Sequence, residues 1–269
     1  MRLATIRVAA LMTILLLAVG ISAGVTVDIN GPYTPAASTV GLWHLDGTTD
    51  DAVGPAPHGN HPGTLHNGAQ FAEGKFGQGL LFDGENDYMR LGNVHTNPSL
   101  PVAQGTVEAW VKMTANDTYF TILGSGREYG GRWDDGFFLG RHWAYGHTLM
   151  FGIWGSGWHY AHSDIDPADL VGQWHHLAGT WGPEGVELWV DGERVATNSW
   201  THGLPNPNYD TALVGSDSWQ WNTPCVVDEV RISSAQLDFT NADVIPEPLT
   251  ASAFFVSLAA VGRYIRRRT

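Results

Sequence analysis

Aromatic side chains are the most prominent chemical feature of this sequence of 269 residues, which contains 12 Trp, 8 Tyr and 10 Phe. A flat ring that lines a groove stacks on the apolar C–H face of a sugar, and charged or amide groups beside it fix the sugar hydroxyls. Rings and charges are densest between positions 132 and 160. We therefore expect a carbohydrate-binding patch there, formed by Arg132, Trp133, Asp134, Trp143, Tyr145 and Trp158.

Half or more of the rings in this region must be core residues instead, because a half-buried strand turns every second side chain inward. Trp154 and Tyr160 lie in the same stretch, and three further tryptophans follow in predicted loops: Trp200, Trp219 and Trp221. Which rings pack and which rings bind stays open at this point.

Carboxylates arranged for catalysis are not found. Glycoside hydrolysis needs two carboxyl groups that flank the scissile bond, about 5 to 10 Å apart. Glu184 and Glu187 would face opposite ways on a strand, and Asp228 and Glu229 are adjacent and would diverge. The sequence also lacks a Gly-x-Ser-x-Gly motif. We therefore predict a non-enzymatic protein with no catalytic residue and keep a glycoside hydrolase as an alternative.

Oxygen donors for a metal ion stand at predicted strand ends and tight turns. Calcium takes six to eight oxygen ligands, and an acidic sandwich can supply them from its loops. The best donors are Asp46, Asp83, Glu85, Asp87, Asp191 and Asp228. Asp before Gly is mostly a turn former, which by itself explains Asp83 and Asp191. Histidines at 58, 61, 66, 159 and 162 lie in segments predicted to be loops, so a zinc or copper site is not favoured.

Charge and cysteine content exclude several classes of protein. The chain has 14 Lys and Arg against 27 Asp and Glu, a formal net charge of −13. Nucleic acid is therefore excluded as a partner, because phosphate binding is driven by cationic side chains. Cys225 is the single cysteine, so the chain has no internal disulfide and no zinc site built on thiolates.

The elements that must position these residues are short strands. Residues 106–113 alternate apolar and polar side chains with period two, which predicts one buried and one exposed face. Residues 186–196 predict a strand, a tight Asp-Gly turn and a returning strand. Further strands are expected at 41–45, 79–82, 88–91, 120–123, 136–139, 149–153, 175–180, 211–214 and 226–232. Helical periodicity is nearly absent, apart from one short turn at 167–171. Many short strands separated by Gly, Asn, Asp and Pro predict an all-β domain of two antiparallel sheets over residues 39–238, preceded by a linker at 25–38.

Six sequence strings in fixed order resemble the laminin G-like, concanavalin A-like family. The strings are LWHLD at 42–46, GQGLLFDG at 77–84, TVEAWV at 106–111, GQWHHLA at 172–178, LWVDG at 188–192 and VDEVRI at 227–232. This resemblance implies a curved jelly-roll sandwich, in which Trp43, Trp110, Trp174, Trp181 and Trp189 are packing residues. It also implies a structural calcium ion near the sandwich edge, for which Asp46 and Asp228 are the positions that correspond. It does not fix function, because the same fold serves lectins, adhesion modules, glucanases and spacers.

Both ends of the chain resemble targeting signals. Arg2 and Arg7 precede an apolar run and the small residues 22–24, which predicts a signal peptide over 1–24 with an open cleavage position. Residues 239–269 contain a Pro-Glu-Pro motif at 246–248, a short apolar stretch and a final arginine cluster. The stretch is near the ~17-residue lower limit for a membrane span. This tail resembles the bacterial PEP-CTERM sorting signal, which implies a sorting protease of the exosortase type as a partner.

Together these features predict an exported protein of the cell envelope, cell surface or extracellular matrix. Its expected task is non-catalytic recognition of carbohydrate or of a matrix polymer. A ligand-free structural matrix protein and a glycoside hydrolase of the same fold remain the alternatives.

Overall fold

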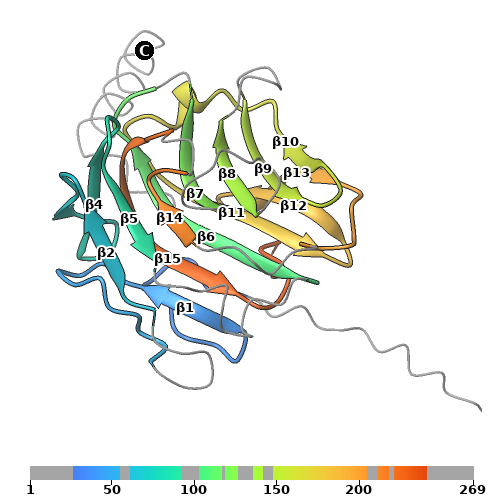
Figure 1. Cartoon of the computed structure of the whole chain (residues 1–269), viewed down its shortest axis with the longest axis horizontal. Coiled ribbons are helices and arrows are strands. Elements are labelled where there is room, and N and C mark those ends of the chain that lie inside the picture. Colours follow the sequence, from blue (N-terminus) through green and yellow to red (C-terminus); the bar gives the residue numbers. More distant parts are fainter. Residues whose placement is uncertain are drawn as a thin grey trace, which may run out of the picture.

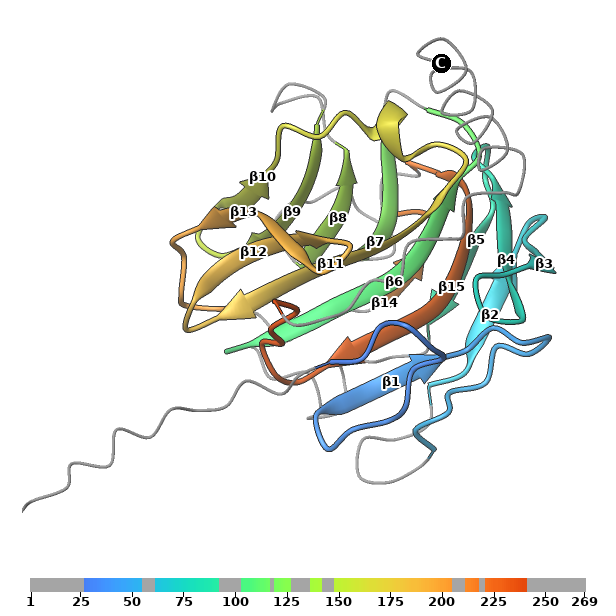
Figure 2. The same ribbon diagram turned by 180° about the vertical axis from the view of Figure 1, so that it is seen from behind.

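The computed structural model describes residues 27–54, 61–91, 103–116, 119–126, 136–141, 148–204, 211–217 and 221–240. These residues form a sandwich of two β-sheets, seen from one side in Figure 1 and from behind in Figure 2. Within each sheet, neighbouring strands are antiparallel. The predicted all-β sandwich of two antiparallel sheets is confirmed.

The larger sheet has eight strands in the described residues, in the order β13-β12-β11-β6-β15-β4-β3, and β1 pairs with the second half of β15. The strands are β1 (Thr39–Trp43), β3 (Gln70–Glu73), β4 (Gln78–Asp83), β6 (Gly105–Met113), β11 (Trp174–Gly182), β12 (Gly185–Val190), β13 (Glu193–Asn198) and β15 (Pro224–Ser233).

The smaller sheet has seven strands in the same residues, in the order β10-β9-β8-β7-β14-β5-β2. They are β2 (Gly63–His66), β5 (Tyr88–Leu91), β7 (Phe120–Gly126), β8 (Phe137–Arg141), β9 (Leu149–Trp154), β10 (Trp158–His162) and β14 (Thr211–Val214). A single 3-10 turn, η2 (Pro167–Leu170), connects β10 to β11, where a short turn is predicted. Within the described ranges, no helix is long and apolar enough to cross a membrane.

Three strands were not predicted: β2, β3 and β10. The histidines His66, His159 and His162 therefore lie on strands, and their assignment to loops was wrong. β2 and β3 are short edge strands with no fully buried residue, so they lack a clear apolar face. β10 has the sequence WHYAH, in which both sets of alternate positions contain a histidine, so neither set has the composition of an apolar face.

The main core lies between the two sheets and is built from alternate residues of their strands. On β6 the inward residues include Val107, Ala109 and Val111, as the sequence predicts, and β12 contributes Val186 and Leu188. The Asp191-Gly192 turn that joins β12 to β13 places both residues at positive φ, 50° and 81°, which is the backbone of a tight hairpin turn. Trp43 and Trp181 are fully buried in this core, so their predicted packing role is confirmed.

The outer face of the larger sheet is also buried, contrary to the exposed face predicted for residues 106–113. Glu108 has no exposed surface and Trp110 only 2%. Two chain segments, residues 27–33 and 237–239, cover this face, and Figure 2 shows the first of them crossing in front of β1 and β15. Residues 27–33 were expected to belong to a linker, but they pack against the sheet. The second apolar cluster contains Val27, Ile29, Tyr33, Leu42, Trp110, Ala178, Trp189, Leu237 and Phe239.

Candidate functional site

A group of aromatic and apolar side chains lies on the outer face of the smaller sheet, away from the main core. We call it the aromatic face and define it as Phe138, Met150, Trp154, Trp158, Tyr160 and Trp221. It is separate from the main core because the alternate residues Phe137, Phe151 and Ala161 are the ones that point between the sheets. Trp154, Trp158 and Trp221 are only partly buried, so their rings reach the surface.

The rings of the aromatic face are held in fixed positions by contacts with one another. The Trp158 and Tyr160 rings stack with centroids 5.4 Å apart and planes 10° apart. Trp154, the cross-strand partner of Trp158, packs edge-on against it at 5.7 Å. At the far end of the group, the Trp221 ring lies edge-on to Phe138 at 6.3 Å. Such preorganised rings lose little conformational entropy when a flat ligand stacks on them.

Gly152 provides the space that the Tyr160 ring occupies. It lies opposite Tyr160 on β9, and Phe138 lies opposite it on β8. A Cβ atom added at Gly152 would meet the Tyr160 ring, closer than any ordinary contact between heavy atoms. A larger residue at this position would therefore displace the ring from its stack with Trp158.

Of the six residues predicted to bind carbohydrate, Trp158 is the one that lies within the described residues, and it belongs to the aromatic face. Arg132, Trp133 and Asp134 fall in the connection between β7 and β8, and Trp143 and Tyr145 fall in the connection between β8 and β9. Those two connections lie outside the described residues.

Phe138 and Met150 were missed as members of this face. Both stand in apolar runs, FF at 137–138 and LMF at 149–151, where a sequence does not show which alternate residue points inward. Trp200 was expected in a loop and lies just after β13, where its ring stacks on His159 at 3.7 Å, away from the aromatic face. A run of alternating rings on β10 was the one signal that could have located the face.

Four buried acidic side chains, Glu108, Glu187, Asp228 and Glu229, lie on the opposite side of the protein, on the outer face of the larger sheet. Asp217 instead lies beside the aromatic face, where it accepts the backbone N–H of Trp221 at 3.2 Å. A β-bulge on β15 between Asp228 and Arg231 puts Glu229 at a φ of 51°. Because the bulge adds a residue, Asp228 and Glu229 both hydrogen bond on the outer side, and the prediction that they diverge was wrong. Asp228 accepts the backbone N–H of Phe76, whereas Glu229 accepts that of Tyr33.

Asp46 and Asp228, the predicted calcium ligands, both accept hydrogen bonds from the backbone around the loop between β3 and β4. Asp46 accepts the backbone N–H of Gln78 at 2.7 Å, and Asp228 accepts that of Phe76 at 2.8 Å. In the described part of the chain, no group of three or more His, Cys, Asp or Glu side chains could hold a metal ion. Side chains alone therefore do not complete a site for calcium, which needs six to eight oxygens.

The calcium prediction can be tested with a chelator. An ion bound only to the folded state stabilises it by about 2.7 kcal/mol at a free concentration one hundred times its Kd. If calcium is held near Asp46, a chelator should lower the melting temperature of the calcium-loaded protein, and Asp46→Asn should abolish that response. Melting curves that coincide with and without chelator would exclude the ion.

The pKa of Asp228 is raised to about 7, mainly by burial and also by the neighbouring charge of Glu229, although hydrogen bonds from backbone N–H groups, that of Phe76 first, act to lower it. Because the pKa in the folded state is above that in the unfolded state, the folded state holds this proton longer as pH rises. The contribution of Asp228 to stability is thus present below the ordinary carboxyl pKa and is lost as pH rises through about 7.

We therefore predict that Asp228 makes the free energy of unfolding fall with rising pH, by at most about 1.4 kcal/mol per pH unit. Urea unfolding from about pH 4 to about pH 8 should show this slope in the wild type, and Asp228→Asn should reduce it. Asp50→Asn, at an exposed carboxylate, is the control and should leave the slope unchanged. Equal slopes in wild type and Asp228→Asn would contradict the prediction.

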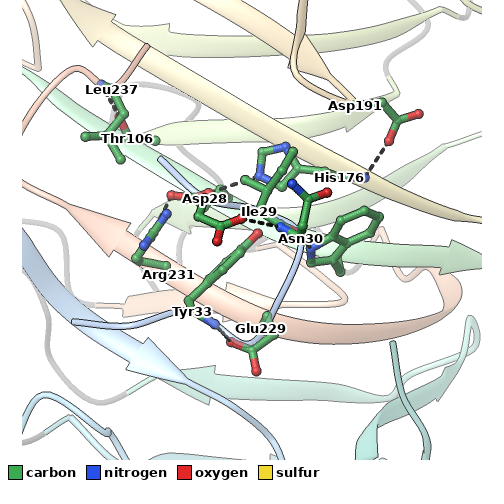
Figure 3. Close-up of polar contacts among 12 residues, drawn as sticks. Asp28, Ile29, Asn30, Tyr33, Thr106, His176, Asp191, Glu229, Arg231 and Leu237 are labelled. Atoms are coloured by element: carbon green, nitrogen blue, oxygen red, sulfur yellow. Dashed lines mark hydrogen bonds and ion pairs between the residues drawn. The ribbon is translucent and has the colours of Figure 1, made fainter. Parts of the chain in front are cut away.

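A charged network lies beside these carboxylates, beneath residues 28–33. Glu108 accepts from Arg231 Nε at 2.8 Å through one oxygen and pairs with His176 Nε2 at 3.0 Å through the other. The Arg231 guanidinium lies over the Tyr33 ring at 4.3 Å. Figure 3 shows Arg231, Tyr33 and His176 grouped around Ile29. Burial tends to raise the pKa of Glu108, but Arg231 and His176 together hold that pKa below its ordinary value.

Residues 83–241 match the profile of a family described as the concanavalin A-like lectin/glucanases superfamily. No curated protein sequence matches the chain.

Solved structures with the same fold share little sequence with the chain. Domain 4 of AbnA, an extracellular arabinanase of Geobacillus stearothermophilus solved with arabinotriose, has a TM-score of 0.61 and 20% identity over 76% of this chain and 95% of that domain. The receptor-binding domain of botulinum neurotoxin mosaic serotype C/D has a TM-score of 0.56 and 16% identity, over 75% of this chain and 48% of that one. Trypanosoma rangeli sialidase has a TM-score of 0.53 and 15% identity, over 77% of this chain and 32% of that one. At these identities the similarity concerns the fold alone.

Proposed function

The chain belongs to the concanavalin A-like lectin/glucanases superfamily, and from this we propose that it binds carbohydrate without cleaving it, through the aromatic face of the smaller sheet. The observation that carries the proposal is the partly exposed Trp158 ring, stacked on Tyr160 and braced by Trp154. Rings held in this way offer a flat apolar platform to the C–H face of a sugar. Arg132, Trp133, Asp134, Trp143 and Tyr145 would add polar and aromatic contacts from the two adjoining connections.

The proposal is supported by the neighbours of the same fold, two of which were solved with carbohydrate or a carbohydrate analogue. The arabinanase domain was solved with arabinotriose, and the sialidase was also solved with 2,3-difluorosialic acid as a covalent intermediate. The match covers 95% of the arabinanase domain, but only 33% of the sialidase chain.

The placement of the carboxylates supports a non-catalytic role. Glu187, on the larger sheet, already accepts from Thr180 Oγ1 at 3.1 Å and pairs with Arg194 at 2.7 Å. Asp228 and Glu229 bind the backbone N–H groups of Phe76 and Tyr33, on the side opposite the aromatic face. A hydrolase would instead need two carboxyl groups on either side of a bound glycosidic bond.

We place this activity outside the cell, at the envelope or in the extracellular matrix. This part of the proposal rests on the sequence of the two ends, which resemble a signal peptide and a sorting tail, and both lie almost wholly outside the described residues. A weak site of this kind would act through many copies on one polymer, because linked binding events raise the effective concentration.

The proposal is tested by screening the purified protein against soluble polysaccharides in affinity gels, together with an assay for released reducing sugar. We expect retardation by at least one glycan and no release of sugar. Release that disappears in Glu187→Gln or Asp228→Asn would show a hydrolase instead. A tryptophan emission spectrum that no polysaccharide changes, together with no retardation, would favour a ligand-free structural protein.

A further inference from the structure

The aromatic face continues beyond Trp221 to a further ring, that of Tyr119, which lies just before β7. The Tyr119 and Trp221 rings stack with centroids 5.6 Å apart and planes 27° apart. Both side chains are only partly buried, as is Trp158 at the other end of the face. Between these ends the side chains are buried, with Phe138 5% and Tyr160 9% exposed. Within the described residues, the partly exposed rings of this face therefore lie at its two ends.

The two ends are joined by a straight row of residues that runs across four strands of the smaller sheet. The members of the row are cross-strand partners on β10, β9, β8 and β7, in that order: Tyr160, Gly152, Phe138 and Gly124. Figure 1 shows these four strands side by side. Three strand spacings separate β10 from β7, so the row covers roughly 14 Å. A single sugar ring at one end therefore does not reach the other, whereas a linear chain of several sugar residues does.

Trp221 is fixed at the β7 end by hydrogen bonds. Its backbone carbonyl accepts the N–H of Thr121 on β7 at 3.0 Å. The buried carboxylate of Asp217 accepts the backbone N–H of Trp221 at 3.2 Å and Thr121 Oγ1 at 2.8 Å. Gly124 leaves room for this approach, because a Cβ atom there would lie 3.1 Å from that of Asp217. Trp221 is thus preorganised, as Trp158 is by its own ring stack, and ordering it on binding costs little entropy.

The charge at this end favours a neutral ligand over an anion. The carboxylate of Asp217 adjoins Trp221, and the chain as a whole has a formal net charge of −13. Both would repel an acidic polysaccharide, because like charges disfavour association. A neutral glycan carries no such penalty.

We propose that the aromatic face binds a linear, neutral polysaccharide at two points, with one sugar residue stacked on Trp158 and another, further along the same chain, stacked on Trp221 and Tyr119. This inference rests on the carbohydrate binding proposed above and adds a second stacking site to it. Once one end of the glycan is bound, the second contact is intramolecular and raises the overall affinity. Affinity therefore increases with the length of the oligosaccharide until the chain reaches both ends of the row.

The test uses the full chain and oligosaccharides of increasing length, prepared from a neutral polysaccharide that retards the wild type in affinity gels. Calorimetric titration gives a Kd for each length. We expect Trp221→Ala to weaken binding of the longest oligosaccharides by about tenfold and to leave binding of disaccharides nearly unchanged. Trp221→Phe keeps a flat ring and should retain more of the affinity. Trp174→Ala, at a partly buried tryptophan of the larger sheet, is the matched control and should change neither Kd.

The outcomes separate this inference from the function on which it rests. If Trp158→Ala weakens binding and Trp221→Ala does not, glycan binding stands and the second stacking site is overturned. An affinity that does not rise with the length of the oligosaccharide also overturns it. If acidic polysaccharides retard the protein and neutral ones do not, the choice of a neutral ligand is wrong. If no polysaccharide retards the wild type, both the proposed function and this inference fail.

Discussion

Replacing Glu108 with alanine should lower the free energy of unfolding by about 3–5 kcal/mol, because it leaves the buried Arg231 charge without its counterion. Both side chains are almost fully buried, at 0% and 5% exposed, so water cannot replace the lost carboxylate. The substitution also removes the partner of His176 Nε2. Urea unfolding of the wild type and the variant at neutral pH measures the loss.

Glu187→Ala is the matched control for this prediction. Glu187 also lies on the outer face of the larger sheet and also pairs with an arginine, Arg194, but that side chain is 51% exposed. Because water can solvate Arg194, no buried charge is left unpaired, and the control should cost less than Glu108→Ala; the loss of the acceptor of Thr180 Oγ1 accounts for about 1–3 kcal/mol. The double variant Glu108→Leu with Arg231→Met should recover much of the loss, since it removes both charges. A cost for Glu108→Ala as small as that of the control would show that the network contributes little to stability.

The pH dependence of this contribution has a definite sign. The partners of Glu108 hold its pKa in the folded state below the ordinary value, so its contribution is present above the ordinary carboxyl pKa. That contribution is lost as pH falls through the lowered value. Glu108 and Asp228 therefore have opposite effects on the pH dependence of stability: the contribution of Glu108 is lost as pH falls, and that of Asp228 is lost as pH rises.

Trp158→Ala should weaken glycan binding by about tenfold to a hundredfold, which corresponds to about 1.4–2.8 kcal/mol. The ring is the partly exposed member of the stack with Tyr160, and its removal takes away the platform on which a sugar would lie. Calorimetric titration of both proteins with a polysaccharide that retards the wild type in affinity gels gives the ratio of the wild-type affinity to that of Trp158→Ala.

The control for Trp158 is Trp200→Ala. Trp200 is also partly buried, but its ring stacks on His159 and its indole N–H donates to the Gly203 carbonyl, away from the aromatic face. We expect its loss to affect stability and not affinity. Gly152→Val should mimic Trp158→Ala in binding, because it pushes the Tyr160 ring out of place. Equal affinities in wild type and Trp158→Ala would place glycan binding elsewhere.

The strands that the sequence predicts well are those whose pattern is local. On β6 and on the β12–β13 hairpin, period-two alternation and an Asp-Gly turn depend only on neighbours in the chain, and both occur where they were expected. Tyr88–Leu91 and Thr211–Val214 have the predicted bounds. These short segments are apolar at alternate positions and are limited by turn residues.

The features that could not be predicted depend on contacts between distant parts of the chain. Tyr33 is buried because its backbone bonds to Glu229, 196 residues later, and its ring lies on Arg231. The bulge that brings Asp228 and Glu229 to one face is a backbone event at a non-glycine residue, which no residue type signals. Within the candidate site, Trp158 was expected from ring density alone, whereas Phe138 and Met150 become visible only when their strands are aligned.

The two chain segments that cover the outer face of the larger sheet, 27–33 and 237–239, determine which face of an anchored molecule is turned away from the anchor. Both leave the sandwich from the same broad side, and the stacked rings of Trp158 and Tyr160 occupy the other side. An attachment at either end would therefore leave those rings pointing away from the point of anchorage. In a crowded layer of identical molecules fixed in this way, every copy would turn the same surface towards the medium.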